Sequence, residues 1–120
     1  MILVDTAVWF ALLVQKDSQH LEVARWFDEL SEPILTTDYR IDETLTLLLM
    51  RKEVLKAIEF GKLIFHADFA VIHFISPEQI YKSWILFQQL CKAGLSFTDC
   101  TLLRPTWGSK RSHLSMDISW

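Results

Sequence analysis

Short runs of mainly apolar residues alternate along this chain with longer segments in which apolar residues recur every three or four positions. The short runs are residues 2–4, 34–36 and 70–74. Brief runs rich in β-branched residues suit strands that are buried on both faces of a parallel sheet. The segments between them have the spacing of amphipathic helices. The order of strand, helices, strand, helices, strand and helix predicts an α/β fold with a central parallel sheet and right-handed crossovers.

Side chains suited to begin a helix stand at the start of several helical segments. Residues 76–79 (Ser-Pro-Glu-Gln) combine a Ser cap, a Pro at the first helical position and a Gln that closes a capping box. Residues 96–99 (Ser-Phe-Thr-Asp) have the same spacing, with Asp in the last place. Thr6 is placed to cap the helix after the first strand, and Thr37 or Asp38 to cap the helix after the second. These signals predict where the helices begin.

The helical pattern ends near Arg104. Residues 105–120 contain four of the nine serines in the chain, together with a Pro and a Gly, and neither the helical nor the strand period continues there. Only Met116–Ile118 could supply a further strand. A chain of 120 residues has the size of one domain. We therefore expect a single domain over residues 1–120, in which 105–120 form an atypical and irregular C-terminal segment.

The composition excludes several classes of protein. With 51% hydrophobic and 22% charged residues, the chain is neither disordered nor fibrous. Three Gly and three Pro leave little material for the many tight turns of an all-β fold. Twelve basic residues against 15 acidic ones give a net charge of -3. A nucleic acid could therefore be held only by local contacts and not by a broad positive field.

Cysteine usage and hydropathy point to the cytoplasm. Cys91 and Cys100 lie nine positions apart, which matches no zinc-binding spacing, and one pair makes no disulfide framework. The first residues lead directly into Asp5 without the apolar core of an export signal. No apolar run approaches the roughly 18 residues of a membrane span. We therefore expect reduced cysteines and a cytoplasmic protein that has no membrane partner.

Three carboxylates are placed to meet at one edge of the predicted sheet. Asp5 directly follows the first strand, Glu43 lies one to two turns into the helix after the second strand, and Asp99 begins a later helix. Ligands of open α/β sheets bind at the carboxyl ends of the strands. Three carboxylates brought together repel unless a hard cation neutralises them, and oxygen ligands suit Mg²⁺ or Mn²⁺ better than zinc. The sequence therefore predicts a magnesium or manganese site.

Each of these residues also has an ordinary structural explanation. Asp5 could end the strand or cap the helix, Asp99 could serve only in the capping box with Ser96, and Glu43 could be a solvated helix residue. The four histidines show no ligand spacing and are interpreted as surface or core groups. The basic cluster at Arg51, Lys52 and Lys56 and the aromatic residues Trp9, Phe27, Trp84 and Phe87 are interpreted as a solvated face and as packing groups.

Three blocks of sequence resemble the motifs of a known family. Residues 2–9 (Ile-Leu-Val-Asp-Thr-Ala-Val-Trp), 36–44 (Thr-Thr-Asp-Tyr-Arg-Ile-Asp-Glu-Thr) and 96–101 (Ser-Phe-Thr-Asp-Cys-Thr) are similar, in order and spacing, to the three motif blocks of PIN-domain proteins. The resemblance is greatest to VapC-like toxins of bacterial toxin–antitoxin systems and covers residues 1 to about 102. It implies a three-layer α/β/α fold around a parallel sheet and a metal-dependent ribonuclease of single-stranded RNA.

The resemblance also implies roles for particular residues. Asp5, Glu43 and Asp99 match the acidic residues that hold the catalytic Mg²⁺ or Mn²⁺ in the family, with Thr6 and Thr98 as polar neighbours. The implied activity is an endoribonuclease that hydrolyses RNA phosphodiester bonds as the toxin of a type II toxin–antitoxin pair. The implied partners are the RNA substrate, a small antitoxin that covers the active-site groove, and a second copy of the chain in a homodimer.

The end of the chain departs from the family pattern. Family members continue past the third block with an apolar helix, a further strand and usually another acidic or amide residue near its end. Asp117, 18 positions after Asp99, is the candidate for that residue here. A reading-frame change or a terminal rearrangement would produce such a loss of pattern.

Two other functions stay open at this point. A catalytically impaired PIN-like module would bind an antitoxin or itself, and would not cleave RNA, if the C-terminal segment leaves the metal site incomplete. An aspartyl phospho-acceptor also carries an Asp after its first strand. It is the weaker alternative, because Ala7 stands where a phosphatase of that type has a second Asp.

Overall fold

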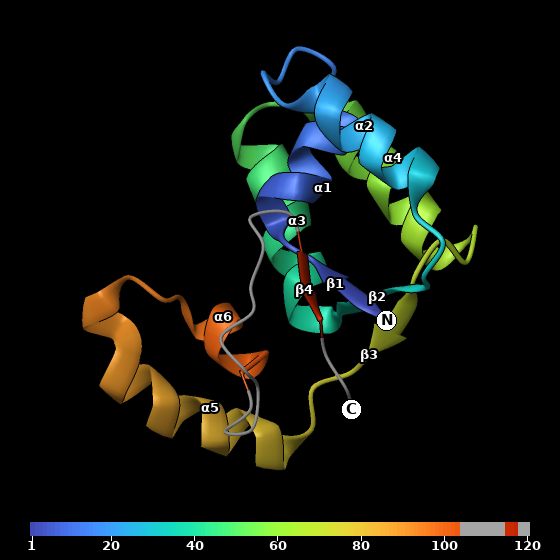
Figure 1. Ribbon diagram of the computed structural model, residues 1–120. Coiled ribbons are helices and arrows are strands. Elements are labelled where there is room, and N and C mark those ends of the chain that lie inside the picture. The colour runs from blue at the N-terminus through green and yellow to red at the C-terminus, as the bar shows by residue number, and fades with distance from the viewer. Residues whose placement is uncertain (104–114, 118–120) are drawn as a thin grey trace.

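The computed structural model describes residues 1–103 and 115–117. Three parallel strands, β1 (Ile2–Val4), β2 (Ile34–Thr37) and β3 (Val71–His73), form the sheet together with β4 (Ser115–Asp117), in the order β3-β2-β1-β4 (Figure 1). The predicted α/β fold with a central parallel sheet is therefore confirmed, and β1 lies inside the sheet. β4 pairs antiparallel with β1, so the fourth strand makes the sheet mixed.

The helices fall into two groups around the sheet, as expected for a three-layer α/β/α fold. One group packs together from α1 to α4, and the other contains α5, a short 3₁₀ turn η1, and α6 (Figure 1). The predicted helix near residue 100 ends at Thr101 and does not extend to Arg104. The bounds are α1 Thr6–Leu13, α2 His20–Glu29, α3 Asp38–Met50, α4 Val54–Phe65, α5 Pro77–Leu90, η1 Cys91–Ala93 and α6 Phe97–Thr101.

Most of the predicted helix starts are confirmed by their hydrogen bonds. Capping boxes form at Ser76, where Gln79 is the partner, and at Ser96, where Asp99 is the partner. The Thr37 hydroxyl accepts from the backbone N–H of Arg40 at 3.1 Å and so caps α3. Each such cap satisfies a backbone donor that the first turn of a helix leaves without a partner.

The prediction that Thr6 caps α1 is wrong. Asp5 occupies the N-cap position, and Thr6 is the first residue of the helix itself. The Thr6 hydroxyl donates instead to the carboxylate of Glu43, 37 positions away in the sequence. Because Thr6 lies one position inside the helix, its hydroxyl is not needed as the cap and can form a hydrogen bond to a residue of α3.

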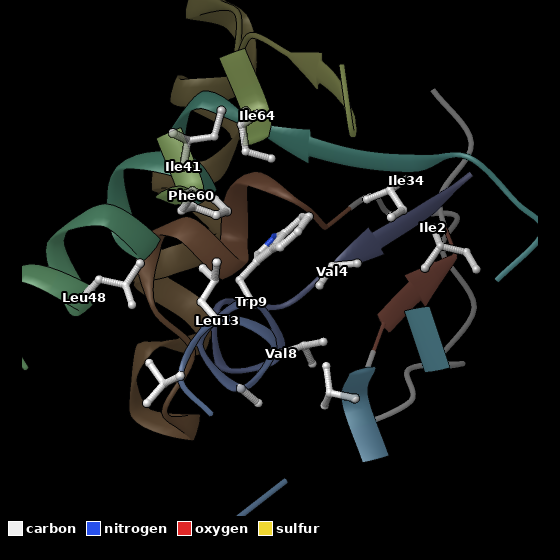
Figure 2. Close-up of a cluster of buried hydrophobic side chains, with 13 residues drawn as sticks. Ile2, Val4, Val8, Trp9, Leu13, Ile34, Ile41, Leu48, Phe60 and Ile64 are labelled. Atoms are coloured by element: carbon white, nitrogen blue, oxygen red, sulfur yellow. The ribbon is translucent and has the colours of Figure 1, made fainter. Parts of the chain in front are cut away.

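Trp9 lies at the centre of the hydrophobic core. It has no exposed surface, and its indole ring lies 5.3 Å from the ring of Phe60 and 5.5 Å from that of Phe27, measured between centroids. Val4, Leu13 and Phe60 surround it in the cluster (Figure 2). This packing joins α1 to α2 and α4. It fixes the position of α1, the helix that begins at Thr6 directly after Asp5.

The interpretation of the other aromatic residues is confirmed only in part. Phe27 packs on Trp9 in the core. Trp84 stacks on Phe87, with 6.3 Å between ring centroids, but half of its surface stays exposed. Helical spacing placed Trp84 on an apolar face of α5, and that face lies only partly against the rest of the described chain.

Candidate active site

The candidate site lies where β1 and β2 end and where α1, α3 and α6 approach one another. Asp5 is the residue between β1 and α1, Glu43 lies in the second turn of α3, and Asp99 lies in the first turn of α6. α3 contacts both α1 and α6. The three residues therefore lie close to the edge of the sheet at which β1 and β2 end, where the sequence placed them.

Arg40, a residue that the sequence analysis did not single out, lies among the three carboxylates. Its side chain is 4% exposed, and its guanidinium is within ion-pair distance of Asp5, Glu43 and Asp99. The α3 cap orients the first turn that carries it, because Thr37 accepts from the Arg40 backbone N–H. All three predicted site residues therefore have one cationic neighbour in common.

The contacts of the guanidinium are close on one side. Nη1 of Arg40 donates to Oε1 of Glu43 at 2.6 Å and to Oγ1 of Thr6 at 2.9 Å. The Thr6 hydroxyl in turn donates to the same Oε1 of Glu43. These three groups form a closed hydrogen-bonded triangle that joins α1 to α3, in which Glu43 is held by two donors.

The contacts on the other side of the guanidinium are longer. Nη2 lies 3.5 Å from Oδ1 of Asp99 and 4.0 Å from Oδ1 of Asp5. The second oxygen of Asp99, Oδ2, accepts from the backbone N–H of Ser96 at 3.0 Å. Asp99 therefore does serve in the capping box, and the cap orients its other oxygen toward Arg40. The structural and the functional explanations of Asp99 are both compatible with this geometry.

The residues match a hard cation in chemistry but are arranged around the guanidinium. Carboxylate and hydroxyl oxygens are the donors that Mg²⁺ and Mn²⁺ prefer, and the cluster gathers three carboxylates and the Thr6 hydroxyl around one positive charge. Across residues 1–103 and 115–117, no three His, Cys, Asp or Glu side chains lie close enough together to hold a metal ion. The assignment of Asp5, Glu43 and Asp99 as catalytic and metal-binding residues stays a prediction.

The family of the chain follows from its sequence over most of its length. Residues 2–104 match the PIN domain. The chain belongs to the PIN-domain family. No protein of curated function is detectably similar to it in sequence. Among solved structures it is similar to Mycobacterium tuberculosis VapC20, described as a toxin that cleaves the sarcin-ricin loop. The TM-score is 0.74 at 22% identity, over 82% of this chain and 75% of that one, so the likeness is one of fold.

Arg40 could have been found from the sequence of this PIN domain by its place on α3. It lies four and eight residues before Thr44 and Leu48, which are fully buried, so helical spacing puts it on the inward face. An arginine on a buried face needs anionic partners nearby. Such a residue therefore points to the carboxylates that surround it.

Other predictions for this PIN domain have mixed outcomes. His20 and His73 have ordinary hydrogen-bond partners in Ala11 and Gln79, as expected for structural histidines. No helix in the described part of the chain is long and apolar enough to cross a bilayer. The expectation of an irregular segment at 105–120 falls mostly on residues outside those described, but its described part forms β4 (Ser115–Asp117), one residue earlier than the strand expected at Met116–Ile118. The side chain of Asp117 lies outside the described part of the chain.

Cys100, next to Asp99, should react more slowly with thiol reagents than Cys91. Burial raises the pKa of the Cys100 thiol above its ordinary value, and the negative charge of Asp99 adds to the effect. The reactive thiolate is therefore scarce at pH 7 to 8. We expect one thiol per chain, that of the exposed Cys91, to react rapidly with a disulfide reagent at pH 7.5.

The pH dependence and a variant check this assignment. Labelling of Cys100 should rise only as the pH passes above the ordinary thiol range, because a raised pKa keeps the thiol protonated to higher pH. Cys91→Ser should leave no rapidly reacting thiol. Two thiols of equal reactivity in the folded protein at pH 7.5 would contradict the burial of Cys100.

Proposed function

We propose that this PIN domain is a divalent-cation-dependent endoribonuclease and the toxin of a type II toxin–antitoxin pair. The observation that carries the proposal is the convergence of Asp5, Glu43 and Asp99 on one buried positive charge at the carboxyl edge of the sheet. Support also comes from the fold, which is similar to that of a toxin described as cleaving the sarcin-ricin loop.

In this proposal the three carboxylates hold Mg²⁺ or Mn²⁺. The chemistry that such an ion supplies is polarisation of a phosphate oxygen and activation of a water molecule. Asp99 is oriented by its bond from the Ser96 backbone, and Asp5 is placed by the turn from β1 into α1. Both carboxylates are suited to bind the cation because they lie on the loosely contacted side of the guanidinium.

Glu43 would complete the shell of oxygen ligands or orient the attacking water as a base. Its Oε1 is held by Arg40 and Thr6, while about a third of its side chain is exposed, so the group is both positioned and accessible to water. Attack by water with a 3′-hydroxyl leaving group gives a 5′-phosphate and needs no 2′-hydroxyl. The products of this reaction therefore differ from those of a ribonuclease that proceeds through a 2′,3′-cyclic phosphate.

The proposed partners follow from the same function. RNA is the substrate, held by the bound cation and a few local contacts, because the net charge of -3 supplies no broad attraction. A small antitoxin would cover the site in the resting cell, and the chain would pair as a homodimer in the cytoplasm, where its RNA substrate occurs.

A catalytically impaired binding module is the second candidate. It is favoured by the position of Arg40, whose guanidinium lies between carboxylates that the nuclease needs for its metal. In that case the chain would bind an antitoxin or itself, and RNA would not be cleaved whichever cation is present.

Cleavage of structured RNA decides between the two candidates. We expect a hairpin that contains the sarcin-ricin loop, or another structured RNA, to be cut in Mg²⁺ or Mn²⁺ and to stay intact in excess chelator. The fragments should carry a 5′-phosphate, which a 5′-phosphate-dependent exonuclease detects. Cleavage that persists in chelator, or fragments that end in 2′,3′-cyclic phosphate, would contradict the proposed chemistry. Absence of cleavage across a panel of RNAs would favour the binding module.

A further inference from the structure

Arg40 brings a positive charge to the place where the proposed function requires a divalent cation. The side chain is 4% exposed, and the three carboxylates around it are between 19% and 33% exposed. The arginine therefore lies deeper than its partners, beneath a set of carboxylates that open toward solvent. A cation arriving from solvent would meet the carboxylates first and the guanidinium behind them.

We infer that Arg40 competes with the divalent cation for the carboxylates of Asp5, Glu43 and Asp99, and so lowers the affinity of the site for Mg²⁺ and Mn²⁺. The role of Arg40 rests on the proposed function, which places the cation at these carboxylates. It goes beyond that function by assigning to one residue control over whether the metal binds.

The guanidinium satisfies the carboxylates unevenly. Its Nη1 contacts to Glu43 and Thr6 are 2.6 and 2.9 Å long, whereas Nη2 reaches Asp99 only at 3.5 Å and Asp5 at 4.0 Å. Both Nη2 contacts are longer than a strong N–H···O hydrogen bond. Within the described residues, Nε of Arg40 also has no hydrogen-bond partner, although it is buried. The Asp5 and Asp99 side is therefore where a small cation with shorter oxygen contacts gains most over the guanidinium.

The charges of the cluster lead to the same expectation. Among the described residues, three carboxylates and one guanidinium leave a formal excess of negative charge, so a divalent cation is still attracted to the site. It would have to bind within a few ångströms of the guanidinium, or displace it. Repulsion between cations that close weakens metal binding even in a water-like environment. A neutral side chain at position 40 removes this repulsion and leaves all three carboxylates in place.

The test is direct titration of Mn²⁺ and Mg²⁺ into the purified protein by calorimetry, without RNA. We expect Arg40→Met, which keeps an unbranched apolar stem, to bind Mn²⁺ at least about tenfold more tightly than the wild type. Arg40→Lys keeps the positive charge and should stay close to the wild-type affinity. Arg25→Met removes an exposed arginine from α2 and serves as the matched control, with no change expected.

Thermal unfolding gives a second readout on the same variants. Arg40→Met removes the buried guanidinium from among the three carboxylates, so it should melt at a lower temperature than the wild type in chelator and gain more from added Mn²⁺. Equal or weaker Mn²⁺ binding by a folded Arg40→Met would overturn the inference. Binding by Arg40→Lys as tight as that by Arg40→Met would also overturn it, because the positive charge would then not be the cause.

The wild-type protein provides a test that needs no variant to fold. Saturating Mg²⁺ should shift or broaden the side-chain N–H signals of Arg40 in an NMR spectrum, as its contacts to the carboxylates loosen. Unchanged Arg40 signals in protein that calorimetry shows to be Mg²⁺-bound would overturn the inference.

The same titrations separate this inference from the proposed function. If Asp5→Asn abolishes Mn²⁺ binding by the wild type while Arg40→Met leaves it unchanged, the metal site stands and only the role of Arg40 fails. If neither the wild type nor Arg40→Met binds Mn²⁺ or Mg²⁺, the cation-dependent function fails and the competition fails with it.

Discussion

Replacing Asp5 by Asn should lower the rate of RNA cleavage by about 100-fold or more. The amide has nearly the shape of the carboxylate but lacks its charge, so the substitution tests electrostatics without opening a cavity. Removing one preorganised charged or polar group from an active site typically costs a factor of about 100 to 1000 in rate. The Asp5 side chain is 19% exposed and lies within ion-pair distance of the same Arg40 guanidinium as Glu43 and Asp99. Its charge is therefore only partly screened by solvent and contributes to the charge of the site. Initial rates on a labelled RNA in Mg²⁺ and in Mn²⁺ measure the effect.

Asp42→Asn is the matched control for this experiment. Asp42 is the neighbour of Glu43 in α3, but its side chain is exposed, and none of the ion pairs described around Arg40 includes it. The same change of charge at that position should leave the rate within about twofold of the wild type, as expected for a solvent-screened surface charge. If the Asp5→Asn protein folds normally and cleaves RNA at the wild-type rate, Asp5 is not an active-site residue.

Trp9→Ala should lower the free energy of unfolding by about 3–5 kcal/mol, the usual cost of removing a large aromatic side chain from a packed core. Trp9 is fully buried and contacts the rings of Phe27, Phe60 and Phe69 at centroid distances of 5.3 to 6.1 Å. Because a domain of this size has about 5–15 kcal/mol of stability in total, the loss is a large share of it. Urea denaturation followed by circular dichroism measures the change.

Trp84→Ala provides the comparison at a tryptophan outside the core. Half of Trp84 is exposed, and its stacking on Phe87 is the ring contact described for it. We expect a loss of about 1 kcal/mol or less, in line with substitutions at partly exposed positions. Similar losses for Trp9→Ala and Trp84→Ala would show that Trp9 does not carry the packing between α1 and the aromatic cluster.

Local signals in the sequence were sufficient for the strands and for most helix starts. The capping boxes at Ser76 and Ser96 and the cap at Thr37 depend on residues three positions apart, so the chain carries both partners within one turn. The left-handed Gly94 after η1, with φ 89°, has the same local origin. The edge at which Asp5, Glu43 and Asp99 meet was also predictable, because connections between parallel strands bring their carboxyl ends together.

The tertiary structure alone decided which groups meet at that edge and how. Thr6 looked like a cap from its neighbours, yet its hydroxyl bonds to Glu43 across 37 positions of sequence. Arg40 reaches Asp99 across 59 positions; helical spacing can place Arg40 on the inward face of α3, but it cannot identify a partner that far away in the sequence. The pairing of β4 with β1 and the exposure of Trp84 were likewise decided by packing. Hydrophobic period and capping act over a few residues, whereas the charge balance of a buried cluster depends on elements that only the folded chain brings together.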